Sequence, residues 1–254
     1  MTIVDNTVSV DVLIVGGGPG GLAVARGYRE AGGRGTVLLV SADEHPPYAR
    51  PPLTKDYLRG ESEAEDLPLA EEDWYRDNAV ELRLGTPVTR IDAAQQQAEL
   101  SDGSTVRYRR LALATGSSPS PLPIPGADLP GLVYVRDRHS GEALRGLAAA
   151  GGRVVVIGSG FIGCEAAASL SRRGVEVVLV TDETQPHAAR LGEEAGRASP
   201  TGCVDLILQD GAAAVRSSGN SWKVELASGR TLLANGVVSG SGARPNLALA
   251  ESAG

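Results

Sequence analysis

Cysteine and histidine are scarce in this chain. Its 254 residues include two cysteines and three histidines. Cys164 and Cys203 lie far apart and outside any Cys-x-x-Cys spacing, so neither a disulfide framework nor a structural zinc site is indicated. His45, His139 and His187 are scattered and form neither a metal-binding spacing nor a catalytic triad. The sequence therefore predicts no metal site.

Long apolar segments are also missing. No run approaches the roughly 18–20 residues that a membrane-spanning helix needs, and Asp5, Asn6 and Asp11 interrupt any signal-like segment at the N-terminus. We therefore expect a cytoplasmic protein without a membrane partner. A formal net charge of −7 argues against nucleic acid as the main partner. The three arginines between residues 107 and 110 still allow a local basic docking patch.

Glycine, by contrast, is abundant, and two glycine clusters share one context. The 33 glycines fit a loop-rich α/β fold. An apolar strand at 10–15 runs into Gly16–Gly21, and a second at 153–157 runs into Gly158–Gly163, each ahead of an expected helix. In such a fingerprint the first glycine permits a tight turn, the second admits a pyrophosphate, and the third allows close helix–strand packing. Two such units predict two dinucleotides and electron transfer between them.

The pattern around each fingerprint repeats. We expect helices at 19–31 and 161–173 and second strands at 36–40 and 175–181. Hairpins are expected to turn at Asp102-Gly103 and Ser228-Gly229. A further buried strand is expected at 111–114, followed by a proline-rich crossover over 117–130. The predicted fold class is α/β, with two three-layer, Rossmann-like dinucleotide-binding domains and β-hairpin or meander insertions.

Four motifs carry a family resemblance. They are Pro47–Lys55 (PYARPPLTK), Ala114-Thr115-Gly116 with Pro123–Gly126, Gly160–Glu165 (GFIGCE), and Gly240–Asn246 (GSGARPN). In these the chain resembles the FAD- and NAD(P)-dependent pyridine nucleotide oxidoreductases, particularly their ferredoxin- or rubredoxin-reductase branch. The resemblance implies an FAD-binding domain of residues 1–116 plus 247–254 and an NAD-binding domain of residues 117–246. It also implies that electrons pass from NADH through flavin to a small ferredoxin- or rubredoxin-like iron–sulfur protein.

The resemblance places the adenosine half of the flavin at the first fingerprint. The residues expected to contact FAD are Gly16, Gly18, Pro19, Gly20, Gly21, Ser41, Arg50, Lys55, Val88, Ala114, Thr115, Gly116 and Arg136. Ser41 stands where an acidic ribose partner is usual, with Asp43 and Glu44 just beyond. A cation such as Arg50 or Lys55 near the isoalloxazine would stabilise the anionic reduced flavin and tune its potential.

The second fingerprint is expected to hold NADH. The expected contacts are Gly158, Gly160, Phe161, Ile162, Gly163, Glu165, Asp182, Arg190 and Gly242. Asp182, beside Thr181, would repel a 2′-phosphate, which favours NADH over NADPH. Lys55 and Glu165 are the candidate catalytic residues, although Glu165 has an equal structural interpretation as a carboxylate near a helix N-terminus. Cys164 is expected to be a small buried residue beside the fingerprint.

Two features separate the chain from other members of the superfamily. Disulfide reductases carry a redox cysteine pair where this chain has Arg50–Leu53, so we expect direct transfer from flavin to acceptor. Full-length relatives also continue into a closing Gly-Asp strand and an interface domain, which we expect to be absent here because the sequence ends at Gly254. Two alternatives stay open. One is a truncated or degenerate nucleotide-binding module without turnover, and the other is a subunit or homodimer completed by another chain.

Overall fold

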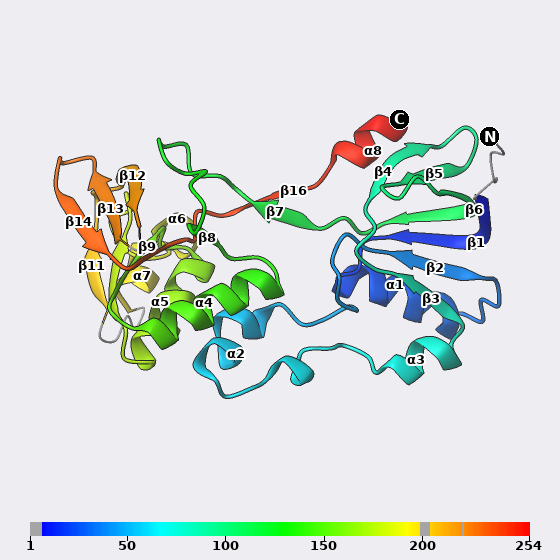
Figure 1. Cartoon of the computed structure of the whole chain (residues 1–254), viewed down its shortest axis with the longest axis horizontal. Coiled ribbons are helices and arrows are strands. Elements are labelled where there is room, and N and C mark those ends of the chain that lie inside the picture. The colour runs from blue at the N-terminus through cyan, green and yellow to red at the C-terminus, as the bar shows by residue number, and fades with distance from the viewer. Residues whose placement is uncertain (1–6, 199–203, 220) are drawn as a thin grey trace. The chain divides into compact units, whose positions relative to one another are not determined.

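The computed structural model in Figure 1 describes residues 7–198, 204–219 and 221–254. Cys203, Asp5 and Asn6 lie outside the described residues. The chain contacts form two compact units. The first runs to Ala49 and adds Leu67–Ser117 and Pro245–Gly254, and the second comprises Arg50–Asp66 and Ser118–Arg244. The expected division placed residues 50–66 in the first domain, whereas their contacts group them with the second unit.

The first unit is built on a six-stranded sheet in the order β3-β2-β1-β6-β5-β4. The strands are β1 (Thr7–Val15), β2 (Val37–Val40), β3 (Val80–Arg83), β4 (Val88–Asp92), β5 (Gln97–Leu100) and β6 (Thr105–Leu113). The pairs β3–β2, β2–β1 and β1–β6 are parallel. Strand β5 pairs antiparallel with both β6 and β4. Strand β2 is buried along its whole length, as expected of a parallel strand covered on both faces.

Each face of this sheet has its own apolar layer. Helices α1 (Pro19–Glu30) and α3 (Glu72–Asp77) cover one face, where Leu22 and Tyr75 pack against Ile14. On the other face the core includes β4 and β5, and helix α8 (Ala248–Ala253) adds Leu249 to it. The first βαβ unit and the hairpin between β5 and β6 therefore agree with the sequence pattern.

The strand expected at 111–114 is not a separate element. It is the end of β6, which runs beside β1 from the Thr7–Thr105 pair to the Val15–Leu113 pair. Leu113 is 39% exposed, so the prediction of a separate buried strand was wrong. The arginines at 107, 109 and 110 interrupt the apolar pattern and conceal the continuity of the strand.

The second unit contains a fully parallel five-stranded sheet in the order β11-β10-β9-β15-β8. Its strands are β8 (Val133–Tyr134), β9 (Arg153–Ile157), β10 (Glu176–Val180), β11 (Asp205–Ile207) and β15 (Gly236–Ser239). Helices α2 (Asp56–Arg59), α4 (Arg138–Ala150) and α5 (Phe161–Arg172) cover one face through Leu58, Leu144 and Leu170. An antiparallel sheet of β12 (Ala212–Ser218), β13 (Ser221–Leu226) and β14 (Thr231–Ala234) covers the other. This arrangement gives the three layers that the sequence predicts.

Short elements complete the chain. They are the 3₁₀ turns η1 (Pro51–Thr54) and η2 (Ala64–Asp66), helices α6 (Ala188–Leu191) and α7 (Glu193–Ala198), and strands β7 (Ser117–Pro119) and β16 (Ala243–Pro245). Strands β7 and β16 pair with each other where the chain passes between the units (Figure 1). In the described part of the chain, no helix combines the length and apolarity required to cross a bilayer.

Candidate functional site

The first glycine turn is shaped by contacts that admit no side chain. Gly16 has φ +121°, and a Cβ there would lie 2.1 Å from the carbonyl oxygen of Ala114. A Cβ on Gly21 would lie 1.9 Å from the carbonyl oxygen of Gly16. Gly18 is the N-cap of α1 and Pro19 its first residue. A Cβ on Gly20 would meet only the side chain of Ala114, at 3.7 Å. The turn therefore presents the start of α1, a favourable place for a phosphate group.

The residues beside this turn are engaged in local contacts. Ser41 is buried, and its hydroxyl accepts the Asp43 N–H at 3.1 Å. Asp43 in turn accepts the Tyr48 hydroxyl at 2.8 Å. Glu44 is an exposed carboxylate just beyond them. Val88 is buried within the sheet core, so only its backbone is available to a ligand.

The end of β6 is tied to the return segment of the same unit. The Thr115 hydroxyl donates to the Asn246 carbonyl at 2.8 Å, and the Asn246 side-chain amide donates to the Thr115 carbonyl at 2.9 Å. The Asn246 N–H also donates to the carbonyl of Gly116, which has φ +66°. The predicted Ala-Thr-Gly site is thus held by residues from both ends of the unit.

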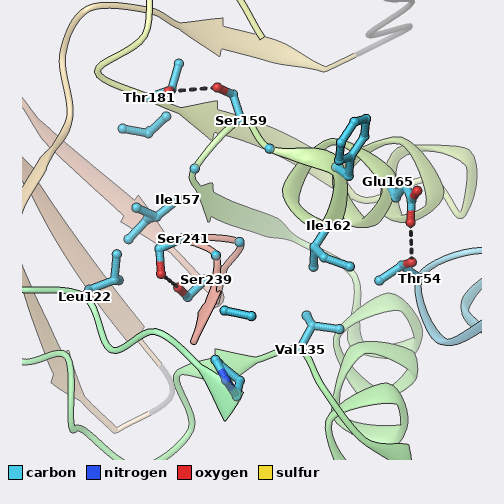
Figure 2. Close-up of a pocket in the computed structure, with 18 of the residues that line it drawn as sticks. Thr54, Leu122, Val135, Ile157, Ser159, Ile162, Glu165, Thr181, Ser239 and Ser241 are labelled. Atoms are coloured by element: carbon cyan, nitrogen blue, oxygen red, sulfur yellow. Dashed lines mark hydrogen bonds between the residues drawn. The ribbon is translucent and has the colours of Figure 1, made fainter. Parts of the chain in front are cut away.

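The second unit contains a cavity of about 810 Å³ (Figure 2). It lies at the carboxyl ends of β9, β10 and β15, where open parallel sheets bind ligands. The predicted site residues that line it are Arg50, Lys55, Arg136, Gly158, Gly160, Phe161, Ile162, Glu165, Asp182, Arg190 and Gly242. Three of these, Arg50, Lys55 and Arg136, were expected to contact flavin, and the structure places them in the same cavity as the second fingerprint.

The second glycine turn repeats the geometry of the first. Gly158 has φ +99°, and a Cβ on Gly163 would lie 2.0 Å from the Gly158 carbonyl oxygen. Gly160 is the N-cap of α5, and a Cβ there would have only the Gly240 carbonyl oxygen nearby, at 3.8 Å. Gly163 therefore serves packing, whereas Gly160 borders open space in the cavity.

A cation and a carboxylate meet on one side of the cavity. The Lys55 ammonium lies 2.6 Å from Oε2 of Glu165. The Thr54 hydroxyl donates to the same oxygen at 2.7 Å, as Figure 2 shows. Thr54 is 2% exposed, and its carbonyl accepts the Ser169 hydroxyl at 2.7 Å. The two candidate catalytic residues are thus brought together. Thr54 escaped the sequence analysis, although it lies inside the PYARPPLTK motif.

The two predicted arginines share a backbone contact. Nη1 of Arg50 donates to the Arg136 carbonyl at 2.7 Å. The following residues form the start of α4, where Asp137 and Ser140 make a capping box. The Ser140 hydroxyl also accepts the Arg136 N–H at 2.8 Å, so this cap holds the backbone that receives Arg50.

A hydrogen-bonded pair of hydroxyl groups lies at the end of β10, near the position where dinucleotide-binding units often carry an acidic residue. Thr181 is 4% exposed, and its hydroxyl oxygen accepts the Ser159 hydroxyl at 2.9 Å and the Glu183 N–H at 3.1 Å. Asp182 and Glu183 both line the cavity. The sequence analysis missed Ser159 and Glu183, along with the cavity-lining Ser239 and Ser241. Their closeness to the fingerprint and to the GSGARPN motif was the available signal.

Cys164 was expected to be buried beside the fingerprint, and the structure shows it only partly buried, packed against the core cluster of the second unit. Its thiol donates to the Ser159 carbonyl at 3.2 Å. Burial raises the pKa of this thiol to about 11, and the charges of Glu183 and Glu165 act in the same direction. Among the described residues, no group of three or more His, Cys, Asp or Glu side chains could hold a metal ion.

Two Rossmann-like units, each with its own glycine turn, are typical of proteins that bind two dinucleotides. The family model for pyridine nucleotide-disulphide oxidoreductases matches residues 10–254. The chain therefore belongs to this family, which confirms the predicted fold class and the resemblance.

Several proteins similar to this chain are named as reductases. Rhodocoxin reductase of Rhodococcus erythropolis is 36% identical over 96% of this chain, and putidaredoxin reductase CamA of Pseudomonas putida is 34% identical over 96%. Among solved structures, the ferredoxin reductase for the CYP199A2 system from Rhodopseudomonas palustris has a TM-score of 0.88, 33% identity and 98% coverage of this chain. The covalent putidaredoxin reductase–putidaredoxin complex has a TM-score of 0.86, 34% identity and 96% coverage. This chain spans between 58% and 61% of the length of each of these relatives.

Proposed function

We propose that this chain is an FAD-dependent NADH oxidoreductase, with FAD held by the first unit and NADH by the second. The support is steric. In each unit the third glycine lies so close to the first that a Cβ would fall 1.9–2.0 Å from a carbonyl oxygen. Such turns leave helix N-terminal amides available for a pyrophosphate. When bound, FAD accepts a hydride from the nicotinamide and releases electrons singly.

The observation that carries the proposal is the Lys55–Glu165 pair in the cavity of the second fingerprint. The ammonium and carboxylate are 2.6 Å apart, and both line the cavity. The Lys55 side chain is 41% exposed, so its remaining N–H donors are accessible to a ligand. Glu165 orients the ammonium, and Thr54 orients Glu165. The pair thus holds a positioned ammonium group at the cavity in which we propose that NADH binds.

The acceptor that we propose is a small iron–sulfur protein of the ferredoxin or rubredoxin type. The support is analogy, because relatives over most of this chain are named as reductases of such proteins, including a rubredoxin-NAD(+) reductase of Pseudomonas putida. A cytoplasmic location and a homodimer remain predictions.

The test is the absorbance spectrum of the purified chain, with and without added FAD, followed by anaerobic titration with NADH. Bound FAD that is bleached by NADH supports the proposal. FAD that binds but is not bleached would favour a nucleotide-binding module without turnover. The molecular mass in solution shows whether the bleached species is a monomer. Bleaching that occurs only in a dimer or with a second chain would favour a subunit completed by another chain. A Lys55→Met variant should retain both nucleotides and slow the bleaching.

A further inference from the structure

A second hydroxyl pair lies in the cavity, at the end of β15. The Ser239 and Ser241 hydroxyl oxygens are 2.8 Å apart, and the Ser241 hydroxyl donates to the Ser120 carbonyl at 3.0 Å. Each hydroxyl carries a single hydrogen. Because Ser241 uses its hydrogen on Ser120, the hydrogen between the two serines comes from Ser239. Ser239 Oγ therefore has no hydrogen left to give, and it faces a ligand as an acceptor only.

Apart from Ser241, apolar side chains border Ser239. Ser239 is 4% exposed and lies in register with Ile157 of β9 and Tyr134 of β8. Figure 2 shows the serine pair beside Leu122 and Ile157. Because the hydrogen of Ser239 Oγ is already donated to Ser241, its remaining lone pairs can pair only with a ligand that brings an N–H or O–H donor.

The order of the strands indicates which half of a dinucleotide reaches this acceptor. In a Rossmann unit the pyrophosphate crosses the glycine turn, and the adenosine ribose lies at the end of the next strand. Here the turn follows β9 and the ribose position follows β10, at Asp182. Strand β15 lies on the opposite side of β9. A dinucleotide bound across this turn would therefore place its nicotinamide half over the end of β15.

We propose that Ser239 Oγ accepts a hydrogen bond from the carboxamide NH₂ of the nicotinamide ring. The apolar side chains of Leu122 and Ile157 line the cavity beside Ser239 and would contact the ring, while Ser239 would recognise its amide substituent. The inference rests on the proposed function, since it requires NADH or NAD⁺ in this cavity. It adds a specificity-determining side chain that lies outside both glycine motifs.

The test combines a side-chain deletion with a ligand deletion. In 3-acetylpyridine adenine dinucleotide a methyl group replaces the amide NH₂ and the carbonyl is kept. Binding of this analogue and of NAD⁺ is measured by calorimetry for the full chain and for Ser239→Ala. Loss of one neutral hydrogen bond predicts about three- to tenfold weaker NAD⁺ binding in Ser239→Ala. The analogue should bind both proteins equally, and Ser239→Thr should restore the preference for NAD⁺.

Ser159→Ala is the matched control, because it removes a hydroxyl of the other pair in the cavity, at the adenosine end. It should weaken both dinucleotides by the same factor. Equal weakening of both by Ser239→Ala would overturn the proposal, since the contact would then be with a ribose or purely structural. If Ser239→Ala does not fold, the unmodified protein decides, because equal affinity for NAD⁺ and the analogue also overturns it. If neither dinucleotide binds the unmodified protein, the proposed function fails and the inference with it.

Discussion

Alanine substitutions at Gly163 and Gly160 should differ sharply in their effect on stability, although the two residues are only three positions apart. In Gly163→Ala, the new Cβ would lie 2.0 Å from the Gly158 carbonyl oxygen. Backbone atoms border this site, so α5 must shift away from the turn by about 1 Å to reach a tolerable contact. Overpacking of this kind costs about 1–3 kcal/mol, and the helix propensity of alanine returns at most about 1 kcal/mol. We expect a net loss of about 1–2 kcal/mol.

Gly160→Ala is the matched variant. Its backbone has φ −73° and ψ −177°, which any residue adopts, and the new Cβ would meet only an oxygen at 3.8 Å. The change costs about 0.5 kcal/mol in stability because alanine is a poorer N-cap than glycine. The methyl group borders the cavity, however, and it should weaken NADH binding by about tenfold through its clash with the pyrophosphate.

Thermal unfolding and NADH titration of both variants measure the two effects. A loss of 1–2 kcal/mol corresponds to a fall of about 2–8 °C in Tm for a chain of this size. Gly163→Ala should show this fall, and Gly160→Ala a fall of at most about 2 °C. The reasoning is refuted if Gly163→Ala melts at the temperature of the unmodified protein, or if Gly160→Ala binds NADH equally well.

Three other expectations concern single side chains. Gly160→Arg should abolish NADH binding and leave bound flavin in place, and expulsion of flavin with NADH still bound would reverse the assignment of the two sites. NADH should bind about tenfold more tightly than NADPH, and Asp182→Ala should reduce this preference, whereas equal affinities in both proteins would make Asp182 ordinary loop surface. In a Cys203→Ser background, Cys164 should react with iodoacetamide at pH 8 about a hundredfold more slowly than an ordinary thiol, because its pKa is raised from 9.0 to about 11. The alkylation rate should increase as the pH approaches 11. If Cys164 in the folded chain reacts as fast as in the urea-unfolded chain, the raised pKa is wrong.

Local patterns were sufficient for the elements that form the two turns. The strand expected at 153–157 is β9, and the helix expected at 161–173 is α5, which ends at Arg172. In this unit an apolar strand is followed directly by Gly158, whose φ of +99° favours glycine. By contrast, β8 and β11 contain two and three residues, too few for any periodicity. They are strands because the neighbouring strands β15 and β10 offer them a free edge.

The grouping of residues 50–66 with the second unit could not be predicted from sequence order. This segment follows the first βαβ unit directly, and its proline-rich start has no repeating pattern. Its position depends on Leu58, which is fully buried in a core cluster with Leu144 and Leu170. Those partners lie more than eighty residues further along the chain, so no local signal marks the contact.

The position of the cation follows from the same long-range packing. Three contacts attach the segment of Lys55 to the second unit near α5: the Ser169 hydroxyl on the Thr54 carbonyl, the Arg173 guanidinium on the Leu58 carbonyl, and the burial of Leu58. Helix α5 also carries Glu165 and begins at the glycine turn. One helix therefore supports the dinucleotide turn, the carboxylate and, through it, the ammonium. Since a displacement of α5 would disturb all three, the contact between Gly163 and Gly158 bears on the chemistry as well as on the fold.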